Sequence, residues 1–138
     1  MAVDLNYNKA NVSLMIASEV TLVSEDRNLA SVINIFEDVE TKSFPHLIPQ
    51  LSVLTSLSTN NVKTAPKQFE FIIYLDDVSK TLFKAEIEPQ FERNNENQRI
   101  IININGLIIP ESGELFFSFW DKKHEVYSYS VPAKENSI

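Results

Sequence analysis

The fold of this chain is decided by the stretch GELFFSFWDKKHEVYSYSV, residues 113–131. Large apolar side chains alternate with their neighbours in both halves of the stretch, and a polar interruption at residues 121–125 separates the two halves. The alternating apolar positions are Leu115, Phe117 and Phe119, followed by Tyr127, Tyr129 and Val131. A period of two residues is typical of strands, and a short polar interruption is typical of a turn. The stretch therefore predicts a β-hairpin with one aromatic face, and other strands must supply the layer opposite to it.

Length and composition favour one soluble globular domain. A chain of 138 residues is long enough for one sizeable core and too short for two comfortable ones. No apolar run approaches the roughly 18 residues that a spanning helix needs, so no membrane association is expected. The first ten residues lack the pattern of a signal peptide, which predicts a cytoplasmic protein if the sequence is a complete precursor.

The charge and the absence of cysteine exclude several classes of function. A formal net charge of -7 repels a phosphate backbone, and the densest basic group is only Lys122 and Lys123. We therefore expect no nucleic-acid partner. With no cysteine there are no disulfides, thiolate nucleophiles or cysteine metal ligands. Stability must come from packing.

Alternating segments separated by polar turns predict about eight strands. These segments are residues 12–23, 29–36, 51–57, 69–75, 81–88, 99–109, 114–120 and 127–131. The first has apolar residues on both parities, which indicates a strand covered on both sides. The second also has helical spacing, and we interpret it as a strand because it is short and rich in β-branched residues, although a helix would change the class to α+β.

The expected architecture is all-β, a single-domain antiparallel β-sandwich of Ig-like or related topology. Its predicted bounds are residues 12–132, with a flexible N-terminal tail at 1–11 and a C-terminal tail at 133–138. Residues 37–49 are expected to be a crossover, because prolines at 45 and 49 disfavour a helix.

Catalytic and metal-binding motifs are weak. The two histidines, His46 and His124, are far apart in sequence, and no serine lies in a Gly-x-Ser-x-Gly elbow. Acidic pairs that could bind Ca²⁺ occur at turns, where aspartate is also ordinary turn chemistry. These pairs are Glu25-Asp26, Glu37-Asp38 and Asp76-Asp77. We therefore expect no enzyme activity, no cofactor and no resident metal.

Four large apolar residues fall on the parity that should face solvent. They are Ile72, Tyr74, Phe116 and Trp120. An open face of this kind would be an aromatic patch, which is typical of an interaction site. Three interpretations remain open: a bulge reverses the parity, loops 37–49 and 58–67 cover the face, or another chain covers it. We take the four residues as candidate partner-binding residues.

At several places the chain resembles a family of short bacterial all-β proteins of unknown function. The segments that carry the resemblance are Ala17-Ser18-Glu19-Val20, Asn34-Ile35-Phe36-Glu37, Ser43-Phe44-Pro45, Gln50-Leu51-Ser52-Val53, Pro110-Glu111-Ser112-Gly113 and Leu115-Phe116-Phe117-Ser118-Phe119. The resemblance implies a β-sandwich and brings no catalytic residues with it.

The sequence thus predicts a non-enzymatic binding or assembly module that acts through protein contacts, either with a protein partner or as a homo-oligomer. The alternative is a ligand-binding β-sandwich that holds carbohydrate or Ca²⁺ at its strand-end loops.

Overall fold

A computed structural model describes residues 7–24, 26 and 29–136, and the described chain is all-β apart from one short 3-10 helix. The elements in chain order are β1 (Asn11–Ser24), β2 (Leu29–Ile35), β3 (Val39–Thr41), β4 (His46–Ser58), β5 (Phe69–Leu75), η1 (Val78–Lys80), β6 (Thr81–Ile87), β7 (Gln98–Ile109), β8 (Gly113–Asp121) and β9 (His124–Glu135). Among the described residues, no helix has the length and apolar character needed to cross a membrane.

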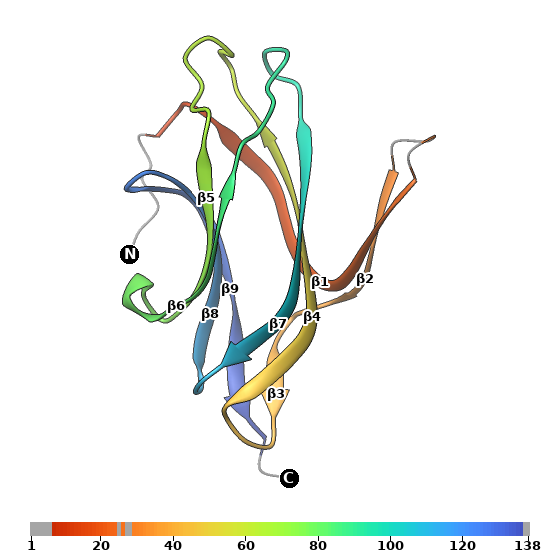
Figure 1. The fold of residues 1–138 in the computed structure, drawn as a ribbon, viewed down its shortest axis with the longest axis vertical. Helices are drawn as coiled ribbons and strands as arrows, with labels where there is room; N and C mark the ends of the chain where they lie inside the picture. Colours follow the sequence, from red (N-terminus) through yellow and green to blue (C-terminus); the bar gives the residue numbers. More distant parts are fainter. Residues whose placement is uncertain (1–6, 25, 27–28, 137–138) are drawn as a thin grey trace.

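The strands form two packed sheets, which confirms the predicted β-sandwich (Figure 1). The four-stranded sheet has the order β2-β1-β4-β7, and the five-stranded sheet has the order β3-β9-β8-β5-β6. All neighbouring strands are antiparallel except β3 and β9. Residues 29–36 therefore form a strand rather than a helix over Leu29–Ile35, in line with their β-branched residues.

The closing hairpin is β8 and β9, paired as the alternation predicts. Phe117 lies opposite Tyr129, and Phe119 lies opposite Tyr127. The turn between the strands places Lys122 at a positive φ of 54°. Inward residues of this hairpin and of β5 meet inward residues of β4 and β7 in one hydrophobic cluster. Fully buried members from the two sides include Phe69, Phe71, Phe117, Phe119, Leu51 and Val53.

Both predicted tails require revision. Residues 133–135, expected in a C-terminal tail, belong to β9, and β3 pairs with them in parallel from Val39↔Ala133 to Thr41↔Glu135. At the other end, residues 1–6 lie outside the described part of the chain. The rest of the predicted N-terminal tail packs on the domain: Ala10 is buried, and the Thr59 hydroxyl donates to the Lys9 carbonyl at 2.8 Å.

Residues 37–49 are also more regular than a crossover. They contain β3, and the first four residues of β4, His46 to Pro49, pair with the end of β7 through His46↔Ile109 and Ile48↔Leu107. Proline is tolerated at Pro49 because β4 there has an irregular pairing position opposite Gly106, which has a φ of 90°.

The far ends of β1 and β2 leave the sandwich as a two-stranded ribbon. The pairing of β1 with β4 ends at Ser18↔Ser52, while its pairing with β2 continues to Ser24↔Leu29. We call residues 20–24 and 29–35 the arm; it projects from the right of the molecule in Figure 1. At its base the Phe36 N–H donates to the Ala17 carbonyl at 3.0 Å, and the Ala17 N–H donates to the Tyr129 hydroxyl at 2.5 Å. The second bond joins the two sheets where the arm begins.

Candidate functional site

The four predicted partner-binding residues lie together on the outer face of the five-stranded sheet. Ile72 and Tyr74 come from β5, and Phe116 and Trp120 come from β8. The register places Tyr74 directly opposite Phe116, and their rings stack with centroids 4.9 Å apart and planes at 9°. The sequence pattern thus correctly placed these four residues on one face of the sheet.

This face is a network of mutual contacts rather than an open aromatic patch. Only 1% of Tyr74 and 5% of Trp120 are exposed, while Ile72 and Phe116 are half-buried. The Trp120 Nε1–H donates to the Ser118 hydroxyl at 2.8 Å, and that hydroxyl donates to the Ile72 carbonyl at 2.7 Å. The two largest rings therefore contribute little surface that a partner could touch.

A buried carboxylate completes this network. Glu125 on β9 is 2% exposed, and its Oε2 accepts a hydrogen bond from the Tyr74 hydroxyl at 2.7 Å. Its Oε1 accepts from the Ser128 hydroxyl at 3.3 Å. Burial, together with the Glu125 carboxylate, raises the pKa of Tyr74, so the phenol keeps its proton and remains a donor. Buried charge is tolerated when it is hydrogen-bonded in this way.

A similar phenol–carboxylate pair holds the N-terminal segment against the closing turn. The Tyr7 hydroxyl donates to Asp121 Oδ2 at 3.0 Å. Burial and the Asp121 charge raise the pKa of Tyr7. Both tyrosines thus serve as hydrogen-bond donors that satisfy buried carboxylates.

The candidate metal ligands that the structure describes do not converge, and Glu25 lies outside the described residues. In the described part of the chain, no group of three or more His, Cys, Asp or Glu side chains could hold a metal ion. At the Asp76-Asp77 pair, the Asp76 carboxylate accepts from the Glu114 N–H at 2.9 Å and the Asp77 carboxylate caps η1 by accepting from the Ser79 N–H at 2.8 Å. The Ser79 hydrogen bonds lower the pKa of Asp77. These carboxylates perform the turn chemistry that was the alternative to Ca²⁺ binding.

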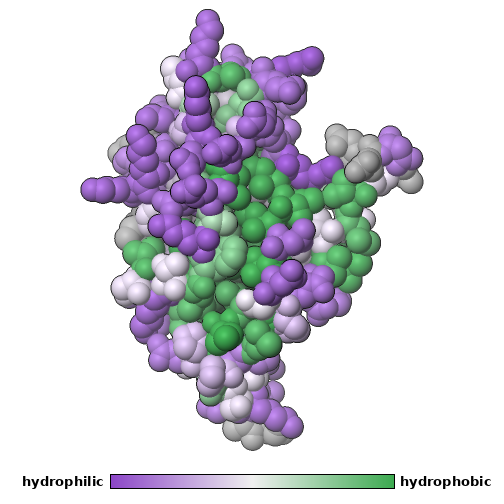
Figure 2. Space-filling view, viewed as in Figure 1, coloured by the Kyte–Doolittle hydropathy of each residue, from purple (hydrophilic) through white to green (hydrophobic). Residues whose placement is uncertain are grey.

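The exposed large apolar residues lie in the other sheet. Among the described residues there are eight, and every one belongs to β1, β2, β4 or β7. They are Leu14, Leu22, Val23, Leu29, Ile33, Ile35, Leu47 and Ile108. In the view of Figure 2, hydrophobic surface gathers at the middle of the molecule and again on the arm at the right. We call these eight residues the apolar face, although Val23 follows Leu22 directly in β1 and therefore points to the opposite side of the arm.

The sequence pattern predicted that part of the apolar face would be covered, whereas the structure leaves it exposed. Apolar residues on both parities of residues 12–23 predicted a strand covered on both sides, and this prediction was wrong for the outer part of β1. Leu22 and Val23 are exposed because β1 continues past its last pair with β4. The alternation of apolar and polar residues along one strand cannot show where that strand extends beyond the neighbouring strand.

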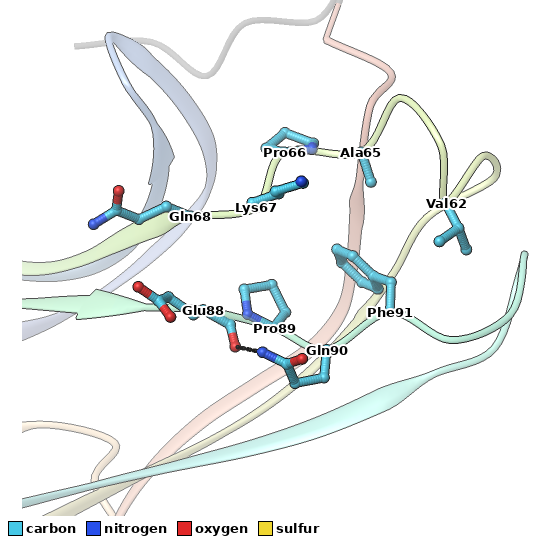
Figure 3. Close-up of a pocket in the computed structure, with 9 residues that line it drawn as sticks. All are labelled: Val62, Ala65, Pro66, Lys67, Gln68, Glu88, Pro89, Gln90 and Phe91. Atoms are coloured by element: carbon cyan, nitrogen blue, oxygen red, sulfur yellow. Dashed lines mark hydrogen bonds between the residues drawn. The ribbon is translucent and has the colours of Figure 1, made fainter.

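A separate hollow of about 540 Å³ lies where two strand-end loops meet (Figure 3). Its apolar lining comes from Val62, Ala65 and Pro66 of one loop and from Pro89 and Phe91 of the other. Polar residues at its rim include Lys67, Gln68 and Glu88. The Gln90 side-chain amide folds back to donate to the Glu88 carbonyl at 3.4 Å.

These features define a small β-sandwich protein with one closed outer face and one exposed apolar face. The chain belongs to a family of unknown function, DUF6941, whose family model matches residues 13–121. The match covers the arm and the core strands up to β8. A search of curated proteins gives no match.

Proposed function

We propose that the protein is a non-enzymatic binding or assembly module that acts through protein contacts made by the apolar face. The observation that carries this proposal is the confinement of all eight exposed large apolar residues to one sheet. Single exposed apolar residues are ordinary on a protein surface, whereas a contiguous exposed apolar patch of more than a few hundred Å² is typical of an interaction site.

The exposed area is of the right size for a protein partner. The eight residues are each 40–60% exposed. Seven of them, without Val23, whose side chain points to the other side of β1, offer on the order of 600 Å² of surface, against about 800 Å² per partner in a standard interface. The arm contributes five of the eight residues, and two paired strands alone are only marginally stable in water. A partner that covers the arm would therefore also stabilise it.

Site-specific photo-crosslinking in the cells that naturally make the protein tests this proposal. A photoreactive phenylalanine analogue at Leu22 or Ile108 should give covalent protein adducts, because these side chains lie on the apolar face. The matched control is the same analogue at Lys84, an exposed position of β6. The absence of adducts from the apolar face, or equal adducts from Lys84, would contradict the proposal.

The hollow between the loops supports a second candidate function, the binding of a carbohydrate. Its position at strand-end loops matches the alternative from the sequence, and Phe91 could offer a ring face to a sugar. Glycan-array binding that disappears in Phe91→Ala but persists in Phe44→Ala would support this candidate. Binding to no glycan would remove it.

A further inference from the structure

The four edge strands of the two sheets differ in their protection against pairing with another chain. Edges are commonly protected by charge, by short length, or by glycine, proline and bulges. β6 carries Lys84 and Glu86, β3 has only three residues, and β7 carries Arg99 and the positive-φ Gly106. β2, with the sequence LASVINI, has no charged residue, no glycine and no proline, and its one irregular position is Asn34 near its end, with a φ of 59°.

The outer edge of β2 is also free. Within the part of the chain that the structure describes, no strand pairs with β2 on the side away from β1. None of its seven residues is buried, and Leu29, Ile33 and Ile35 are 50%, 42% and 53% exposed. A long, exposed, apolar edge strand is a template for strand addition.

The direction of the free backbone groups follows from the ladder. In an antiparallel pair, alternate residues exchange hydrogen bonds with the partner strand. The Phe36 N–H bonds to the Ala17 carbonyl, and the β1–β2 register is constant from Ser18↔Ile35 to Ser24↔Leu29. By this register, counting back from Phe36 in steps of two, past the positive-φ Asn34, pairs Val32 with β1 and leaves the N–H and C=O groups of Ser31 and Ile33 pointing outward.

From these observations we propose that the occupant of this edge is a second copy of the same chain, paired through antiparallel β2–β2 contact about a two-fold axis at Val32. The proposal rests on the proposed function and identifies its partner. In this register Ser31 lies opposite Ile33, so the outward-pointing groups of these two residues meet in hydrogen-bonded pairs, and Leu29 lies opposite Ile35, beyond the irregular Asn34. The contact is self-complementary, as a two-fold interface requires.

Charge favours this site of contact over others. Each copy carries a formal charge of -7, so two copies repel each other at long range. Residues 20–24 and 29–35 contain no charged side chain. The two strands of the arm therefore bring no charge into the contact, whereas the connection between them carries Glu25, Asp26 and Arg27. Raising the salt concentration from about 0.05 to 0.5 M should strengthen the pairing several-fold, because screening reduces the long-range repulsion.

Cysteine cross-linking in the full chain tests the proposed register. The chain has no cysteine, so Val32→Cys provides a single thiol in each copy. On the two-fold axis, Val32 faces itself in a non-hydrogen-bonded pair with Cα atoms about 4.5 Å apart, within the disulfide range. We expect air oxidation to yield a disulfide-linked dimer for Val32→Cys. The control, Ser130→Cys at an exposed position of β9, should remain monomeric on non-reducing gels.

A second variant tests the same edge without covalent chemistry. Ser31→Lys places a charge opposite Ile33 of the second copy and diagonal to its own symmetry mate, and should weaken self-association by on the order of tenfold or more. Ser130→Lys is the matched control and should not change it. Sedimentation velocity gives the mass, and Trp120 fluorescence shows that each variant is folded, because this ring is buried.

The outcomes separate this proposal from the proposed function. A chain that is monomeric at about 100 μM, with no Val32→Cys dimer, overturns β2 pairing. If the photoreactive analogue at Leu22 then still cross-links a different protein in cells, the proposed function stands. If it gives no adduct, both the proposed function and β2 pairing are contradicted. A dimer that Ser31→Lys leaves intact also overturns β2 pairing.

Discussion

Tyr129 shows how a single side chain can connect the two sheets. Its hydroxyl accepts the Ala17 N–H at 2.5 Å, at the position where β1 begins to leave β4. Alternation along β9 predicted that Tyr129 points inward. Its partner could not be predicted, because residues 17 and 129 are brought together only by the packing of the sheets.

Tyr129→Phe should lower the free energy of unfolding by about 1–3 kcal/mol at pH 7, because the Ala17 N–H loses its acceptor. Burial of the Tyr129 hydroxyl also predicts a pH dependence, whereas the Ala17 bond by itself lowers the pKa, because an N–H donor stabilises the phenolate. Burial raises the pKa of Tyr129 from 10.0 to about 12. The unfolded chain ionises near its ordinary value of about 10, so the stabilisation is present below pH 10 and is lost as the pH rises from 10 to 12.

Urea unfolding at pH 7, 10, 11 and 12 measures both effects. The variant should lose less stability than the parent chain above pH 10, although Tyr7 and Tyr74 still contribute. The control Tyr127→Phe removes a hydroxyl two positions away and leaves the Ala17–Tyr129 bond in place. Equal pH profiles for the parent chain and Tyr129→Phe would contradict the assignment.

The positive-φ residues at turns show which backbone conformations the residue type alone predicts. Because the chain has only two glycines, asparagine and aspartate are the residue types best suited to the positive-φ positions of its turns. Asp76 and Asn95 do so, with φ of 65° and 60°. Lys122 also does so and was not expected, because its conformation follows from the tight β8–β9 connection rather than from its own preference.

At the scale of elements, the β3–β9 ladder is the feature that the sequence did not reveal. β3 has three residues, too few for an alternation pattern, and its partner is nearly a hundred residues away. Ending the chain after Pro132 should lower the free energy of unfolding by about 1–3 kcal/mol, because the ladder and buried Ala133 are lost.

The matched control for this truncation ends the chain after Asn136. It keeps β3 paired and keeps the Asn136 N–H to Thr41 carbonyl bond of 2.7 Å. Its urea midpoint should equal that of the full chain. A chain ending at Pro132 that is as stable as the control would show that β3 and the end of β9 contribute nothing.

At the scale of the whole molecule, one hydrophobic cluster joins both sheets. The sandwich should therefore unfold in one cooperative transition. Leu51→Ala in β4 and Ile73→Ala in β5 remove fully buried side chains from opposite layers. Each should lower the free energy of unfolding by about 2–5 kcal/mol and shift the same transition.

Coincident curves from Trp120 fluorescence and far-ultraviolet circular dichroism check this prediction. Ile108→Ala is the control, because Ile108 is 60% exposed and its truncation should cost far less. Separate transitions for the two variants would mean that the sheets fold as independent units.

The sequence by itself determined the strands, the closing hairpin and the inward aromatic face, because a two-residue period is a local property of a chain with one buried side. It also placed Ile72, Tyr74, Phe116 and Trp120 together on one outer face. Tertiary structure alone decided which outer face is closed and which is open. Exposure depends on where each strand ends relative to its neighbours, so the closing hairpin carries a satisfied network around Glu125, while β2 remains uncovered on the arm.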